Sequence, residues 1–263
     1  MAILSPPSPK SFLLLGSSAP RFPKSLHQFR SNITSSITPV SFPRLEFRHA
    51  PLTASGRPRI VAGASPGAVD GFGEDIGQAV GGVAIFTASG ERVLFRDLWD
   101  QNNGLAAVVL LRHFGCMCCW ELASALKEVK PRFEQAGVKL IAVGVGTPDK
   151  ARMLATRLPF PMECLYADPE RKAYDVLGLY YGFGRTFFNP ASAKVFSRFN
   201  ELREATKNYT IEATPEDRSS VLQQGGTFVF RGNKLMYGRK DEGTGDHASL
   251  DHVLDLCCKA PVA

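Results

Sequence analysis

The sequence predicts an α/β fold in which buried strands alternate with amphipathic helices. Residues 105–112 and 138–146 are nearly continuous apolar runs rich in Val, Leu and Ala, as expected for strands covered on both faces. Between them, Leu122, Leu126 and Phe133 recur at helical spacing and define one apolar helix face. A strand–helix–strand order of this kind favours parallel strands joined by a right-handed crossover.

The other elements follow from shorter signals. Residues 82–99 predict a short hairpin, or a strand followed by a turn of helix. Thr147 at the cap position and Pro148 at the first helical position predict a helix over 147–158. The remaining expectations are a strand at 162–167, a capped helix at 168–179, a helix at 191–209, a surface loop at 214–226, strands at 226–230 and 234–240, and a closing helix at 247–260.

The first 69 residues have a composition of their own. They contain eight basic residues and a single acidic one, Glu46, and are rich in Ser, Thr and Pro. This is typical of an organelle transit peptide, and the opening Met-Ala with abundant Ser favours a plastid. We therefore predict a disordered chloroplast transit peptide over 1–62, a linker over 63–79 and one globular domain over 80–260, located in the stroma. The alternative is a disordered cytosolic tail.

Charge and hydropathy exclude several classes of function. The net charge of residues 1–69 is +7 and that of the whole chain is +6, so residues 70–263 carry −1. The sequence pI near 9.1 comes from the leader and does not indicate nucleic-acid binding. The longest apolar run, 104–111, is much shorter than the ~20 residues that a membrane span needs. We expect a soluble mature protein with no membrane span.

A dense cysteine cluster lies between the first buried strand and the helix that follows it. Residues 112–120, RHFGCMCCW, place Cys116, Cys118 and Cys119 within four positions. Residues three apart at a helix start have Cα atoms roughly 5–6 Å apart, which suits a disulfide. A bridge between the adjacent Cys118 and Cys119 would be strained. Cys116 and Cys119 are therefore the natural redox pair.

The position of this cluster favours a reactive thiolate. Free backbone amides and the helix dipole at a helix N-terminus stabilise a negative charge. Arg112 and His113, just upstream, are candidate stabilisers because either could add positive charge and lower a cysteine pKa. A strand–CxxC–helix order in an α/β sequence indicates redox catalysis.

Metal binding and inert packing are the alternatives. His113 with the three clustered cysteines offers four metal ligands, but a structural zinc site usually draws them from two separated segments. No second ligand pair is evident, so we expect neither a metal nor another cofactor. Cys164, Cys257 and Cys258 are interpreted as packing residues. Five aromatic residues could either pack in the core or line an apolar substrate pocket, and core packing is the favoured interpretation: Tyr180, Tyr181, Phe183, Phe187 and Phe188.

Four segments resemble a known family: residues 110–129, 140–154, 165–179 and 225–238. They are similar to the AhpC/TSA antioxidant family, specifically to its thioredoxin-like, peroxiredoxin-like branch that carries a CxxC motif. The resemblance covers about residues 80 to 258. It implies a thioredoxin fold, with a central mixed β-sheet flanked by helices and redox cysteines at the start of the first long helix.

The sequence departs from this family at positions that matter for chemistry. A standard peroxiredoxin has a Pro-x-x-x-Thr/Ser-x-x-Cys motif, and alignment on Cys119 puts Cys116 at its Thr position and Arg112 at its Pro position. Alignment on Cys116 does not restore the motif either. The peroxidase arginine would fall at Gly225 and the thioredoxin cis-proline at Gly226. Without these groups, reduction of hydrogen peroxide by the usual mechanism is not expected to be efficient.

The functional prediction is a thiol–disulfide oxidoreductase of peroxiredoxin-like type, active in redox homeostasis and antioxidant defence. It would reduce a peroxide, lipid peroxides included, or a protein disulfide, and take electrons from a thioredoxin or glutathione system. We favour Cys116 as the attacking thiol and Cys119 as the resolving one, although peroxiredoxin logic reverses them. No role is assigned to Cys118. The alternative is a non-catalytic redox-sensing or metal-binding module.

Overall fold

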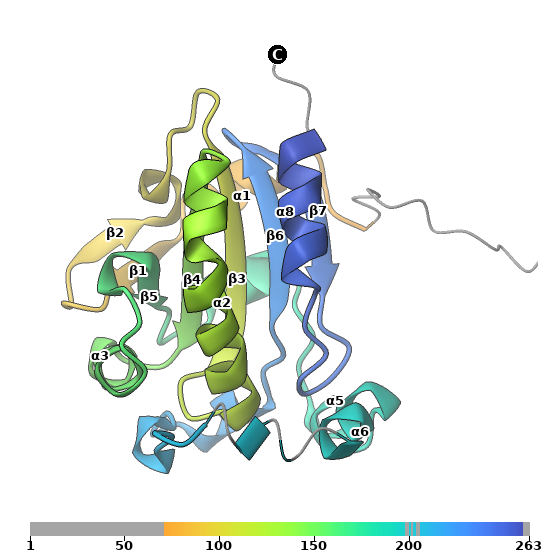
Figure 1. Ribbon diagram of the computed structural model, residues 1–263. Coiled ribbons are helices and arrows are strands. Elements are labelled where there is room, and N and C mark those ends of the chain that lie inside the picture. The colour runs from red at the N-terminus through yellow and green to blue at the C-terminus, as the bar shows by residue number, and fades with distance from the viewer. Residues whose placement is uncertain (1–70, 198–199, 201, 204–205, 260–263) are drawn as a thin grey trace, which may run out of the picture. The chain divides into compact units, whose positions relative to one another are not determined.

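The computed structural model describes residues 71–259 except 198–199, 201 and 204–205 (Figure 1). The predicted transit peptide, residues 1–62, lies outside the described residues, as does most of the predicted linker. No helix in the described part of the chain is long and apolar enough to cross a lipid bilayer.

One mixed β-sheet forms the centre of the domain. Its strand order is β2-β1-β5-β4-β3-β6-β7. The pairs β3·β4 and β4·β5 are parallel, while β1·β2, β1·β5, β3·β6 and β6·β7 are antiparallel. The strands are β1 Ala84–Thr87, β2 Arg92–Leu94, β3 Leu105–His113, β4 Val138–Val145, β5 Leu165–Ala167, β6 Gly226–Arg231 and β7 Lys234–Lys240.

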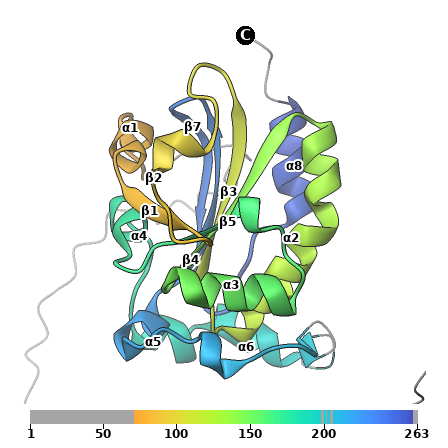
Figure 2. The same ribbon diagram turned by 90° about the vertical axis from the view of Figure 1, so that its left-hand side faces the viewer.

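Helices cover both faces of this sheet. In Figure 2, α1 and α4 lie on one side of the strands, and α2 and α8 lie on the other. The α-helices are α1 Ile76–Gly81, α2 Met117–Gln135, α3 Pro148–Arg157, α4 Lys172–Val176, α5 Phe183–Phe187, α6 Pro190–Ser197 and α8 Leu250–Lys259. Short 3₁₀ helices are η1 Phe95–Leu98, η2 Met162–Cys164, η3 Ile211–Ala213 and η4 Arg218–Leu222.

This arrangement confirms the predicted thioredoxin fold. The order β4-β3-β6-β7, with β3 and β4 parallel and β6 and β7 antiparallel to their neighbours, is the four-stranded centre of that fold. The first long helix, α2, follows β3 directly. The predicted hairpin at residues 82–99 is also present, and η1 provides the turn of helix after it.

The strand β3 divides the core into two parts because its side chains alternate between the faces. Ala107, Val109 and Leu111 pack with α2, α3 and α8, whereas Val108 and Leu110 pack with α1, η1 and α4. Eight of the nine β3 residues are buried. A strand covered on both faces in this way explains the continuous apolar run in the sequence.

The end of β3 that leads to the cysteines is irregular. Pairing with β6 ends at Leu110, opposite Gly226, and the register with β4 shifts between Leu110 and His113. Irregularities of this kind redirect side chains and commonly occur next to active sites. Here the irregular end places Arg112 and His113 just before the N-terminus of α2.

Several elements differ from their predicted bounds. Part of the predicted linker forms α1, where Val80 and Gly81 are buried. Thr147 occupies the N-cap of α3, but its side chain makes no capping hydrogen bond. The helix expected at 168–179 is reduced to α4, because the Asp168 carboxylate accepts hydrogen bonds from the amides of Lys172 and Ala173 and fixes the start there.

The predicted surface loop at 214–226 is the largest correction. Its middle forms η4, and Ser220, Gln223 and Gln224 are buried. Buried amide side chains need hydrogen-bond partners, and Gln224 Nε2 donates to Thr186 Oγ1 at 2.9 Å. This segment therefore packs against α5 at the end of the sheet where α2 begins.

Candidate active site

The three clustered cysteines lie at the N-terminal end of α2. Cys116 is the N-cap residue, and its sulfur makes no capping hydrogen bond to the helix backbone. All three thiols are free and buried, with exposed fractions of 6% for Cys116, 4% for Cys118 and 0% for Cys119. Cys116 is thus the more exposed member of the predicted Cys116–Cys119 pair, and it lines a pocket.

Arg112 brings a buried positive charge to this cluster. Its side chain is 4% exposed, and its NH1 group donates to Cys116 Sγ at 3.5 Å. The guanidinium is held in place by donation from Nε to the Gln223 carbonyl at 2.9 Å and from NH2 to the Val221 carbonyl at 2.5 Å. Backbone carbonyls in and just after η4 therefore hold the guanidinium next to the Cys116 sulfur.

The surroundings of Cys116 stabilise its thiolate. Hydrogen bonds from the thiols of Cys118 and Cys119 lower the pKa of Cys116 well below the ordinary value, although burial alone would raise it. The Arg112 charge lowers this pKa further. Because the thiolate is the nucleophilic form of cysteine, these contacts make Cys116 the reactive sulfur of the cluster.

The pKa values of Cys118 and Cys119 are raised, in contrast to that of Cys116. The hydrogen bond with Cys116 and burial raise the pKa of Cys118, and burial and the same kind of hydrogen bond raise the pKa of Cys119. Both are therefore protonated when Cys116 is ionised. The Cys119 sulfur also accepts a hydrogen bond from the Arg112 amide at 3.2 Å. One thiolate next to two thiols is the arrangement that a dithiol catalyst requires.

His113 differs from the expectation that it could supply positive charge. Burial lowers the pKa of His113 more than the nearby Cys116 sulfur raises it, so the neutral ring is favoured. Its Nδ1 atom is buried and has no hydrogen-bond partner among the described residues. Since a neutral ring contributes no net charge, the cation beside Cys116 is Arg112.

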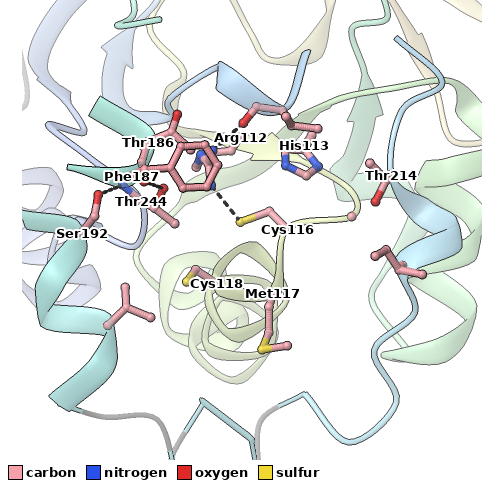
Figure 3. A pocket seen from close by; sticks show the side chains of 14 residues that line it. Arg112, His113, Cys116, Met117, Cys118, Thr186, Phe187, Ser192, Thr214 and Thr244 are labelled. Carbon is pink, nitrogen blue, oxygen red and sulfur yellow. Dashed lines mark hydrogen bonds between the residues drawn. The ribbon is translucent and has the colours of Figure 1, made fainter. Parts of the chain in front are cut away.

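A pocket of about 550 Å³ opens over the Cys116 sulfur (Figure 3). Its walls come from the β3 end, the start of α2, and the segments around α5, α6, η3 and η4. Apolar atoms dominate, and the rim residues Phe187 and Ile211 are 56% and 73% exposed. The lining residues are Arg112, His113, Gly115, Cys116, Met117, Cys118, Thr186, Phe187, Ser192, Val195, Ile211, Thr214, Val221 and Thr244.

Gly115 allows one wall of this pocket to approach the motif closely. A Cβ atom at this position would lie 2.1 Å from Thr214 Oγ1 and 2.4 Å from Thr214 Cα. The loop is also held by Tyr209, whose hydroxyl donates to the Gly115 carbonyl at 2.8 Å, and by Trp120 Nε1, which donates to the Phe114 carbonyl at 2.6 Å. The position of Cys116 is therefore fixed by its neighbours in the loop.

His247, in the segment between β7 and α8, also contacts the cysteine motif. Its Nε2 atom lies 3.3 Å from the Cys118 carbonyl, and its Nδ1 atom lies 3.2 Å from Asp241 Oδ2. Burial alone would lower the pKa of His247, but the hydrogen bond and charge of Asp241 outweigh it and raise this pKa. Asp241 is buried and the His247 side chain is 11% exposed, so this contact helps to fix the first turn of α2.

The two positions that depart from the family leave no room for side chains. At Gly225 a Cβ atom would lie 2.3 Å from the Leu110 carbonyl oxygen, and at Gly226 it would lie 2.8 Å from the Arg239 carbonyl oxygen. An arginine at Gly225 would not fit against this backbone. The guanidinium beside the sulfur comes from Arg112 on β3 instead.

The three other cysteines of the chain lie outside the site. Cys164 is buried near the start of β5, and Cys257 and Cys258 lie in α8. No group of three or more His, Cys, Asp or Glu side chains in the described ranges is arranged to hold a metal ion. The core-packing interpretation was wrong for four aromatic residues, which are exposed: Tyr181, Phe183, Phe187 and Phe188.

Sequence reasoning missed the residues that complete the pocket from distant segments. Thr186, Ser192, Thr214 and Thr244 line it, yet none belongs to a recognisable motif. Val221 and Gln223 position Arg112 through their backbone carbonyls, which carry no side-chain signature at all. His247 lies just before α8, and no motif in the sequence marks it as a site residue.

Comparison with known protein families gives one match: the AhpC/TSA antioxidant enzyme family matches residues 125–243. This range begins after the cysteine motif and ends after β7. It includes the β6–β7 hairpin and the segment that positions Arg112.

Three curated relatives extend the likeness across the motif and the described domain. The thioredoxin-like protein AAED1, chloroplastic, of Arabidopsis thaliana is 32% identical over 201 residues, which cover 75% of this chain and 78% of the relative. Peroxiredoxin-like 2C of Mus musculus is 28% identical over 201 residues, covering 74% of this chain and 86% of the relative. Prostamide/prostaglandin F synthase of Bos taurus is 30% identical over 183 residues, covering 68% and 86%.

Proposed function

Because the chain belongs to the AhpC/TSA antioxidant enzyme family, in its thioredoxin-like, peroxiredoxin-like branch, we propose that it is a thiol–disulfide oxidoreductase that cycles Cys116 and Cys119 between dithiol and disulfide. One observation carries this proposal. The Cys116 sulfur has a lowered pKa, accepts a hydrogen bond from Arg112 and lines an apolar pocket.

The reaction with a peroxide ROOH follows from this geometry. The Cys116 thiolate attacks the outer oxygen, the O–O bond breaks, and the alkoxide RO⁻ takes up a proton and leaves as ROH. Cys116 is thereby oxidised to a sulfenic acid. The Cys119 thiol then attacks that sulfur, a disulfide forms, and the oxygen leaves as water. A dithiol of the thioredoxin or glutathione system restores both thiols by disulfide exchange.

Arg112 takes the part that a peroxidase arginine has in the family. Its guanidinium lies beside the sulfur, where it can also donate to the peroxide oxygen on which negative charge develops. Donors already fixed in a buried site stabilise such charge strongly, since they need no reorganisation during the reaction. This supports peroxide reduction by a route in which the arginine comes from β3.

The pocket supports an apolar substrate. An organic hydroperoxide, lipid peroxides included, would place its chain against Met117, Phe187 and Ile211 and its peroxide group at Cys116. A protein disulfide is the other candidate substrate, and the exposed rim is where a polypeptide would bind. The name of the Bos taurus relative refers to a lipid product, which is compatible with an apolar pocket.

The proposed location is the chloroplast stroma. The basic leader over residues 1–62 supports it, as does the word chloroplastic in the name of the Arabidopsis thaliana relative. Import of the full chain into isolated chloroplasts should yield a shortened stromal product with an N-terminus near Ala62. A full-length product outside the organelle would contradict this location.

A redox-sensing module without turnover is the second candidate. The observation that favours it is the burial of all three sulfurs, which restricts the approach of a protein reductant. In that case oxidation of the pair would change a partner interaction and no substrate would be consumed. A metal-binding variant of this candidate predicts one equivalent of zinc in freshly purified protein, and zinc analysis tests it.

Steady-state turnover separates these candidates. The purified protein is supplied with NADPH, thioredoxin reductase and thioredoxin, or with the glutathione system, together with hydrogen peroxide, cumene hydroperoxide or a protein disulfide. The proposed function predicts catalytic NADPH consumption with at least one acceptor and none with Cys116→Ser. Formation of a single disulfide per chain without further NADPH consumption would establish the sensing function instead.

A further inference from the structure

The two thiols that hydrogen-bond to Cys116 have different surroundings. Cys116 and Cys118 both line the pocket, whereas Cys119 is not among the described residues that do so. Figure 3 shows the sulfurs of Cys116 and Cys118 at the pocket. Cys118 is therefore the neighbour that shares the substrate side of the site with the attacking sulfur.

Cys119 is held on the inner side of the cluster. Its side chain is fully buried, and its sulfur accepts the hydrogen bond from the Arg112 amide. Among the described residues, no hydrogen bond from the backbone of β3 restrains the Cys118 sulfur, and the Cys118 carbonyl lies 3.3 Å from His247 Nε2.

Oxidation of Cys116 changes the two neighbouring thiols unequally. The hydrogen bond with Cys116 is the main cause that raises the pKa of Cys118, and it requires Cys116 to be a thiolate. Burial is the main cause that raises the pKa of Cys119, and burial remains after oxidation. Conversion of Cys116 to a sulfenic acid therefore removes more of the barrier to ionisation at Cys118 than at Cys119.

The spacing permits a bond between Cys116 and Cys118. Residues two apart in a turn have Cα atoms roughly 5–7 Å apart, which overlaps the disulfide range of about 4.4–6.8 Å. Cys116 has an extended backbone at the N-cap, with φ −89° and ψ 120°, so its side chain is not fixed by the helix. The adjacent pair Cys118 and Cys119 remains a strained alternative.

From these contacts we propose that Cys118 is a second resolving thiol for Cys116, which reacts before Cys119, a role that rests on the proposed thiol–disulfide function. Once Cys116 is a sulfenic acid, the Cys118 sulfur attacks the Cys116 sulfur. The S–O bond breaks, the S–S bond forms, and the hydroxide takes up the Cys118 proton and leaves as water. The resulting Cys116–Cys118 disulfide faces the pocket, where a dithiol reductant can reach it, and two electrons from that reductant restore both thiols.

The first test uses the unmodified chain. Reduced protein receives a substoichiometric pulse of cumene hydroperoxide, free thiols are blocked with N-ethylmaleimide, and the disulfide is then reduced and labelled with iodoacetamide. All three cysteines lie in one tryptic peptide, residues 113–127, and fragmentation between residues 118 and 119 shows which of them was oxidised. The proposal predicts iodoacetamide on Cys116 and Cys118 in the earliest time points, with Cys119 carrying the maleimide.

Two variants make the result decisive. Cys119→Ser should still form an internal disulfide, now between Cys116 and Cys118. The double variant Cys118→Ser with Cys119→Ser should form none and should accumulate a sulfenic acid that dimedone traps. If Cys119→Ser also accumulates the dimedone adduct without a disulfide, Cys118 is not a resolving thiol, although the proposed function stands. If Cys116 is not oxidised in any of the proteins, the proposed function itself fails.

Discussion

Two groups of adjacent cysteines in this chain share a residue type and a helical setting but differ in their chemistry. Cys116, Cys118 and Cys119 lie at the N-terminal end of α2, beside Arg112 and a pocket. Cys257 and Cys258 lie near the C-terminal end of α8, where the helix dipole disfavours a thiolate. Hydrogen bonds from two thiols and the Arg112 charge lower the pKa of Cys116 against the effect of burial, whereas burial raises the pKa of Cys257 to about 11.

This contrast shows that burial alone does not determine whether a cysteine is inert. Cys116 and Cys257 are almost equally buried, at 6% and 2% exposed. What differs is the presence of hydrogen-bond donors and a cation next to the sulfur. The same desolvation that penalises an unpartnered thiolate strengthens its attraction to a buried guanidinium.

The largest effect expected concerns Cys116 itself. Cys116→Ser should abolish turnover, lowering kcat/KM by about 10³-fold or more, because a serine hydroxyl is not ionised at neutral pH. Cys257→Ser, the matched control in α8, should leave turnover within about twofold. A coupled NADPH assay measures both. Equal losses in the two variants would remove the distinction between the clusters.

Removal of the cation should have the next largest effect. Arg112→Met should raise the pKa of Cys116 and lower kcat/KM by about 10–100-fold near neutral pH. Arg112→Lys should recover part of the loss, since it restores the charge without the planar contacts. Arg132→Met, which affects an exposed arginine paired with Asp251, is the control and should be neutral. An unchanged Cys116 pKa in Arg112→Met would contradict the role of this cation.

The pocket rim should have a smaller and substrate-selective effect. Phe187→Ala should raise KM for cumene hydroperoxide about 3–10-fold, because apolar contact surface is lost, and should leave hydrogen peroxide kinetics unchanged. Phe188 is 76% exposed and is not among the described pocket residues, so Phe188→Ala is the control. A similar change for both peroxides would show that the rim acts on the fold and not on substrate binding.

The smallest effect is expected at His113. Its ring is neutral near physiological pH, since burial lowers its pKa. His113→Leu should therefore shift the Cys116 pKa less than Arg112→Met does. A shift as large as that of Arg112→Met would mean that His113 is protonated beside the sulfur.

Much of the fold could be predicted from the sequence because its signals are local. The buried strands β3 and β4 are continuous apolar runs, and the face of α2 is marked by Leu122, Leu126 and Phe133. The predicted bounds were less accurate for elements with weaker sequence signals. The start of α4 is set by the Asp168 carboxylate, and Gln224, just after η4, is buried with a hydrogen bond to Thr186 in α5.

The residues at the centre of the site were also predictable, because their sequence signals are local. The residues that form the walls of the pocket were not predictable. Strand, cysteines and helix follow one another in the chain, so the place of Cys116 and Arg112 could be inferred from order alone. The carbonyls of Val221 and Gln223 reach Arg112 across more than 100 residues of sequence, with separations of 109 and 111. Contacts of a side chain with backbone carbonyls so far along the chain leave no pattern in the sequence. Gly225 signalled a missing arginine, but only the structure shows that Arg112 lies beside the sulfur.

The pH dependence of alkylation at Cys116 tests the central claim most directly. Reduced protein is treated briefly with iodoacetamide across a pH series, and the modification of peptides 113–127 and 241–259 is quantified by mass spectrometry. Alkylation of Cys116 should stay fast as the pH falls through the ordinary cysteine value of 9.0, and should slow only well below it, while Cys257 should stay unreactive until the pH approaches about 11. A Cys116 midpoint at or above 9.0 would contradict a stabilised thiolate at the start of α2.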